Sequence, residues 1–98
     1  MVRRFLGALV LLATTNCGGT LYAINASSAA SKIEEAKELG AEQSAPYEYF
    51  YAKAHLEQAQ VDASEAAYSD AVNYAETAEE YAEKAIALTK AANKASGR

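Results

Sequence analysis

The order of apolar and polar residues divides the chain into one uninterrupted apolar run and three segments of helical period. Residues 5–13 read FLGALVLLA and carry no charge. From residue 21 onward, apolar residues recur every three or four positions, which is the period of one face of a helix. The pattern predicts an all-α protein with helices over about 21–39, 46–63 and 67–94.

Glycine and proline mark the first boundary between these helices. Gly40 favours a helix end, because glycine adopts a positive φ at little cost. Pro46 suits the first turn of the next helix, where its missing N–H is not needed. One apolar stripe is predicted in each of the two helices beside this boundary. They are Ala26, Ala29, Ile33 and Ala36 in the first helix, and Tyr49, Ala52, Leu56, Ala59 and Ala63 in the second.

The last helix carries the most regular pattern. Its predicted seam steps by four and three through Ala67, Ala71, Tyr74, Ala78, Tyr81, Ala85, Leu88 and Ala92, which is a heptad repeat. A single helix from Pro46 to Lys94 would be roughly 70 Å long and would leave this seam uncovered. A turn near Ser64 is therefore favoured. We expect a three-helix antiparallel (up-down-up) bundle that ends in a TPR-like hairpin and is preceded by a signal-peptide helix.

The N-terminus has the organisation of an export signal. The positive stretch MVRR precedes the apolar run, and Thr14, Thr15 and Asn16 follow it. A positive end, a short apolar core and a boundary of small residues are typical of a secretory signal peptide. Nine residues span about half of a ~30 Å hydrocarbon core, so a transmembrane anchor is disfavoured. We predict a signal peptide over residues 1–16.

The chain has a single cysteine, Cys17, directly after this segment. Its position resembles the lipobox of bacterial lipoproteins, although Thr14 and Asn16 stand where Leu and a small residue are usual. The resemblance implies acylation of Cys17. We therefore predict a lipidated linker over 17–22, and the helical pattern that follows predicts a helical domain over 23–98. A residue other than Asp after the cysteine, here Gly18, implies an outer-membrane location facing the periplasm. The alternative is cleavage after Ala23, which would give a soluble periplasmic protein.

Composition and charge exclude several classes of function. The chain has 98 residues, 9 Lys and Arg, 13 Asp and Glu, one Cys and one His. The acidic balance argues against nucleic-acid binding. A single cysteine and a single histidine exclude an internal disulfide and a Cys/His zinc site. We expect no cofactor and no metal. The 24 alanines favour helix and predict close packing.

Two blocks of the sequence resemble a known family. Residues 40–51 read GAEQSAPYEYFY, and residues 68–78 read YSDAVNYAETA. Together with an Ala-rich last helix, they are similar to small bacterial outer-membrane lipoproteins built on a helical domain of unknown function. His55 departs from the tyrosine that is common there. The resemblance implies a lipid-anchored periplasmic helical module and no particular activity.

The tyrosines are the candidate binding residues. A catalytic role for His55 is disfavoured, because it lies on a predicted helix next to Leu56 and is expected to be a surface or half-buried side chain. Tyr47, Tyr49, Phe50 and Tyr51 are consecutive enough that they cannot all face the core, since neighbouring helical positions lie about 100° apart. We therefore expect a non-enzymatic adaptor or structural protein that binds a protein or peptidoglycan partner through these residues. The alternative is a self-associating coiled coil, in which the chain would form an oligomer.

Overall fold

The computed structural model describes residues 17–97, and these residues form an all-α bundle. The predicted signal peptide, residues 1–16, lies outside the described residues, as does the side chain of Cys17. The helices are α2 (Cys17–Leu39), α3 (Ala41–Ser44), α4 (Pro46–Ser64) and α5 (Tyr68–Ala95). None of these helices is long and apolar enough to span a bilayer.

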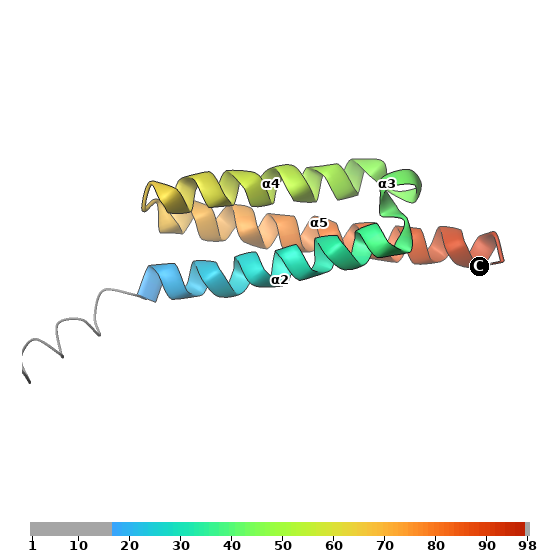
Figure 1. Ribbon diagram of the computed structural model, residues 1–98, viewed down its shortest axis with the longest axis horizontal. Helices are drawn as coiled ribbons and strands as arrows, with labels where there is room; N and C mark the ends of the chain where they lie inside the picture. Colours follow the sequence, from blue (N-terminus) through green and yellow to red (C-terminus); the bar gives the residue numbers. More distant parts are fainter. Residues whose placement is uncertain (1–16, 98) are drawn as a thin grey trace, which may run out of the picture.

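The three long helices run up, down and up, as predicted, and α5 contacts both of the others (Figure 1). The helices α2 and α4 contact each other much less than either contacts α5. Residues 17–22, predicted as a linker, belong to α2, so this helix begins four residues earlier than expected. The short helix α3 occupies most of the predicted connector over residues 41–45.

Both turns form where the sequence indicated them. Gly40 has a φ of 97°, a left-handed conformation that glycine adopts without strain, and it ends α2. The helix α4 ends at Ser64, and Ala66 adopts a φ of 60° in the following turn. An alanine in this conformation is strained by about 1–2 kcal/mol relative to a right-handed one. The backbone N–H of Ala67 donates to the carbonyl of Asp62 at 2.8 Å and closes the turn.

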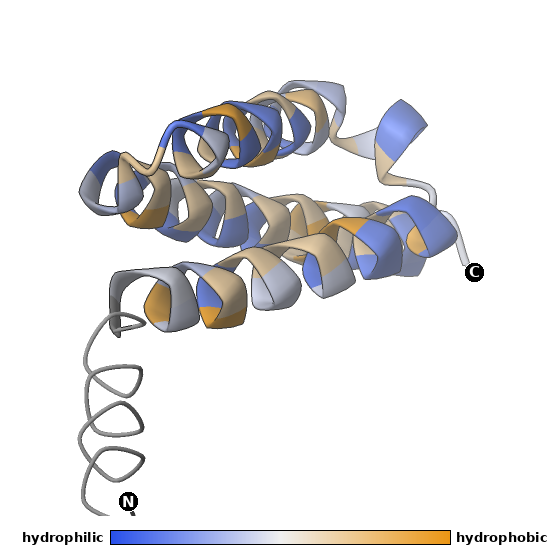
Figure 2. Ribbon diagram, turned by 60° about the vertical axis from the view of Figure 1, so that its left-hand side comes forward, coloured by the Kyte–Doolittle hydropathy of each residue, from blue (hydrophilic) through white to orange (hydrophobic). Residues whose placement is uncertain are grey.

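The core consists almost entirely of alanine. Among the buried apolar residues of the described part of the chain, only Ile33 and Tyr49 are larger than alanine. Strongly hydrophobic residues are few and scattered over the helices, and most of the ribbon is pale or blue (Figure 2). Small side chains let helix backbones approach closely, so this bundle is held together by close contact more than by the burial of large side chains.

The buried face of α5 is rotated relative to the predicted seam. It comprises Ala71, Ala75, Ala78, Ala82, Ala85 and Thr89. The seam correctly included Ala71, Ala78 and Ala85, but it also placed Tyr74, Tyr81, Leu88 and Ala92 at the interface. Tyr74 and Leu88 are exposed to 38% and 47%, and Tyr81 is half-buried. The small residues occupy the interface because α5 must approach two helices at once, and a tyrosine ring would hold them apart.

Within residues 17–97, one buried side-chain polar atom has no hydrogen-bond partner. Thr89 is completely buried on α5, and its hydroxyl makes no hydrogen bond within the described part of the chain. An unsatisfied buried hydroxyl typically costs about 1–3 kcal/mol. Nearby, the amide of Asn93 donates to the carbonyl of Leu39 at 3.2 Å, which satisfies one of the free carbonyls at the end of α2.

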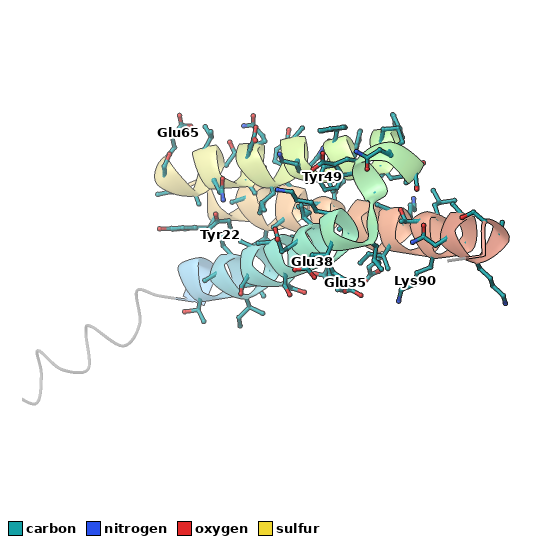
Figure 3. The ribbon with its side chains drawn as sticks, turned by 45° about the vertical axis from the view of Figure 1, so that its right-hand side comes forward. Tyr22, Glu35, Glu38, Tyr49, Glu65 and Lys90 are labelled. Atoms are coloured by element: carbon teal, nitrogen blue, oxygen red, sulfur yellow. The ribbon has the colours of Figure 1, made fainter. Side chains whose placement is uncertain are left out.

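Charged side chains join α2 to α5 along their exposed edge. The Lys32 amine binds the carboxylates of Glu79, at 2.7 Å, and Glu83. The hydrogen bond to Glu79 raises the pKa of Lys32, and the same bond lowers the pKa of Glu79. Farther along, Lys90 and Glu35 lie 4.0 Å apart (Figure 3). Partly exposed ion pairs of this kind contribute about 0–1 kcal/mol each, so they add modestly to the contact between α2 and α5.

Candidate functional site

The four candidate residues at the start of α4 have different environments. Tyr47 and Phe50 are exposed to 63% and 52%, Tyr51 is half-buried, and Tyr49 retains only 2% exposure. Their separation follows from the helix period, because Tyr49 belongs to the face that meets α2 and α5 (Figure 3). The expectation that this group cannot face one direction is confirmed. Tyr49 cannot contact a partner and is removed from the candidate site.

Tyr49 closes the core beside the α2–α3 turn. It packs with Ile33, Ala36, Ala45 and other buried residues from all four helices. Burial raises the pKa of its hydroxyl, and the negative charge of Glu42 adds to this effect. The ring of Phe50 lies edge-on to Tyr49, with 5.0 Å between ring centroids. Phe50 therefore covers the core residue and still exposes half of its surface.

The remaining aromatic residues form a continuous row between α4 and α5, which we call the aromatic ridge. It consists of Tyr47, Tyr51 and His55 from α4, and Tyr74 and Tyr81 from α5. The three α4 residues are spaced by four and so lie on one face of the helix. The two α5 residues are one heptad apart. They belong to the predicted seam that proved to lie at the edge of the α5 interface.

Tyr51 is the centre of the ridge. Its ring centroid lies 4.0 Å from that of His55, in a stacked arrangement, and 4.1 Å from that of Tyr81. Tyr47 contacts both Tyr51, at 5.6 Å, and Tyr81, at 6.3 Å. Each aromatic pair adds about 0.5–1.5 kcal/mol beyond area burial. Tyr51 therefore supports the hairpin, and Tyr47 is the member of the ridge that is most free to contact another molecule.

The end of the ridge near α3 carries its own cation. The Lys84 amine lies 4.4 Å from the centroid of the Tyr81 ring, and it pairs with Glu80 at 3.2 Å. The hydrogen bond to Glu80 raises the pKa of Lys84. A tyrosine face, a carboxylate and an amine are thus combined within one turn of α5.

The other end of the ridge opens into a groove, which we call the α4–α5 groove. Its volume is about 350 Å³. It is lined by Tyr51, His55, Asp70, Asn73, Tyr74 and Thr77. A second groove of about 260 Å³ lies between α2 and α4, with Ile33 and Leu56 among its lining residues. Within residues 17–97, no group of three or more His, Cys, Asp or Glu side chains is arranged to hold a metal ion.

The sequence interpretation named the tyrosines on α4 but not the groove. His55 was expected to be a surface or half-buried side chain, and it is half-buried, whereas Asp70, Asn73 and Thr77 were not singled out. The spacing of Tyr47, Tyr51 and His55 was a usable signal for a shared face. The α5 residues that line the groove gave no comparable signal in the sequence. Asp70, for example, lies at the groove only because of how α5 is rotated against α4.

The family of the chain follows from a comparison with family models. Residues 25–96 match the family described as Domain of unknown function (DUF4398), and the chain belongs to this family. The match covers α4, α5 and all but the first eight residues of α2. Searches of curated proteins and of solved structures gave no match.

Proposed function

We propose that the chain is a non-enzymatic, lipid-anchored adaptor or structural protein of the bacterial cell envelope. It is attached to the outer membrane through acylated Cys17, faces the periplasm, and binds a protein or cell-wall partner through the aromatic ridge. The observation that carries the proposal is the exposure of Tyr47, 63%, at the α3 end of the ridge, where it contacts the rings of Tyr51 and Tyr81. Tyrosine is enriched at protein interfaces because it combines a large apolar area with a polar tip.

The position of Cys17 supports the anchor. It is the first residue of α2, and Gly18 and Gly19 follow it against the ring of Tyr68. A Cβ at Gly18 would lie 3.2 Å from the Cβ of Tyr68, so glycine permits the close approach of α2 to α5. Lipid on Cys17 would therefore place the α4–α5 turn near the membrane and the Tyr47 end of the ridge away from it.

Self-association is the second candidate function. The observation that favours it is Leu88, which is 47% exposed on α5. The end of α5 extends beyond α3 and α4 in Figure 1. A second copy packed against the exposed face of α5 that carries Leu88 would cover this side chain. We rank this candidate lower, because the alanines that dominate the heptad positions of α5 specify an oligomeric state poorly.

Replacing Cys17 with serine tests the anchor. We expect the variant to lose palmitate labelling and to move from the membrane fraction to the soluble fraction, because two or more acyl chains are what hold such a protein on a bilayer. Globomycin should cause the uncut precursor of the unsubstituted chain to accumulate. Ser27→Ala, an exposed change on α2, is the control and should alter neither readout. Unchanged processing and fractionation of Cys17→Ser would contradict the lipid anchor.

A further inference from the structure

The α4–α5 groove is lined by aromatic rings and by polar side chains whose free groups are mostly hydrogen-bond acceptors. Tyr74 is 38% exposed beside it, and its ring centroid lies 5.6 Å from that of His55. Asp70 is exposed in the first turn of α5 and has no hydrogen-bond or ion-pair partner among the described residues. The groove is therefore open, partly aromatic and bordered by an unpaired carboxylate.

Two of the side chains that line the groove already donate their hydrogens to backbone carbonyls. The Nδ1 of His55 lies 2.9 Å from the Tyr51 carbonyl oxygen, and because a carbonyl only accepts, Nδ1 carries the proton. In neutral His55 the lone pair is then on Nε2. The Thr77 hydroxyl donates to the Asn73 carbonyl at 3.0 Å and keeps its oxygen lone pairs. The groove thus offers more acceptors than donors, and its donors are the Asn73 side-chain amide and the hydroxyls of Tyr51 and Tyr74.

The heptad repeat of α5 allows Tyr74 at the groove to be compared with Tyr81, whose ring has a cation over it. Tyr81 has Lys84 three residues later, and that amine lies over the Tyr81 ring while pairing with Glu80. One heptad earlier, Tyr74 has Thr77 in the place of Lys84. The carboxylate at this end comes from Asp70, and none of the six lining residues is a lysine or an arginine. Among residues 17–97, a lysine amine lies over the ring of Tyr81, but no cation lies over the ring of Tyr74.

We propose that the α4–α5 groove binds the guanidinium group of an arginine from a basic segment of the partner protein. A guanidinium has five N–H donors and no acceptor, so it matches a groove whose free groups are mainly acceptors. It stacks on aromatic rings and pairs with a carboxylate through two parallel hydrogen bonds. Tyr74 supplies the ring and Asp70 the carboxylate. Charge is complementary as well, because residues 17–98 keep all 13 acids and only seven of the nine basic side chains, a formal charge of −6.

The inference rests on the proposed role of the ridge in partner binding, and it does not depend on lipid at Cys17. It is tested with the full chain in micelles of a zwitterionic detergent, titrated with N-acetyl-arginine amide and followed by NMR. We expect the signals of His55, Asp70 and Tyr74 to shift together with a Kd on the order of millimolar. Asp70→Asn should weaken binding roughly tenfold, since the charged hydrogen bonds are lost. Glu76→Gln, an exposed charge removal on another face of α5, should leave the Kd unchanged.

N-acetyl-citrulline amide separates charge from shape, because it resembles arginine in size but is neutral. It should shift these signals little, and N-acetyl-lysine amide should bind more weakly than arginine because an ammonium is not planar. Absence of coordinated shifts with arginine would overturn the proposal. So would equal binding by Asp70→Asn, by citrulline or by lysine, or binding of N-acetylglucosamine in place of arginine. These micelle measurements involve neither the membrane nor the partner, so their failure is distinct from failure of the anchor or of the adaptor function.

Discussion

Replacing Tyr49 with alanine is expected to remove a large part of the free energy of unfolding of the protein. Tyr49 is 2% exposed and is the only aromatic side chain among the buried residues of the described chain. Truncating a large buried aromatic residue costs about 3–5 kcal/mol, because the cavity is only partly filled by relaxation. A domain of this size has a total stability of about 4–12 kcal/mol. The surrounding alanines cannot extend into the space, so the cost should lie at the upper end.

The matched control is Tyr47→Ala, two residues earlier on the same helix. Tyr47 is 63% exposed, so its loss should cost about 1 kcal/mol or less, mainly through its contacts with Tyr51 and Tyr81. Urea unfolding followed by far-ultraviolet circular dichroism compares the two variants. If both lost the same free energy of unfolding, the assignment of Tyr49 to the core and of Tyr47 to the surface would be wrong.

Enlarging the alanine face of α5 is expected to have the second largest effect. Ala78 is completely buried on the helix that contacts both α2 and α4. A leucine there adds three heavy atoms where two backbones approach closely. Overpacking of this kind costs about 3 kcal/mol, because neither helix can withdraw without losing its other alanine contacts. We therefore expect Ala78→Leu to lower the urea midpoint strongly.

Ala87→Leu provides the comparison, because Ala87 is exposed on the same helix. Its free energy of unfolding should change by about 0.5 kcal/mol or less, since leucine and alanine differ little in helix propensity. A neutral Ala78→Leu would show that the bundle has room at its centre. That result would contradict a core that depends on close backbone approach.

The sequence predicted the helices well because their boundaries carry specific signals. Gly40 and Pro46 delimit the first turn, and the ends of α4 and α5 lie within one residue of the expected positions. The start of α2 was placed late, because Gly18 and Gly19 have poor intrinsic helix propensity. Their contact with Tyr68 supplies a tertiary reason for glycine at these positions.

The orientation of α5 was harder to predict than its extent. A heptad of Ala and Tyr defines a stripe, but alanine differs too little from its neighbours in hydrophobicity to show which edge of the stripe is buried. Close packing decided in favour of Ala75 and Ala82 over Tyr74 and Tyr81. The same rotation brings Tyr74 and Tyr81 next to α4. Only the α4 residues of the aromatic ridge could therefore be predicted from the sequence to share a face.

The central claim is that the ridge is the surface through which an envelope-anchored protein contacts its partner. The most direct measurement places a photo-crosslinking amino acid at position 47 in intact cells and compares it with position 60, because Gln60 is exposed on the α2–α4 side of α4. The account predicts a discrete membrane-associated adduct from position 47 and none from position 60. Equal adducts from both positions, or none from position 47, would contradict it.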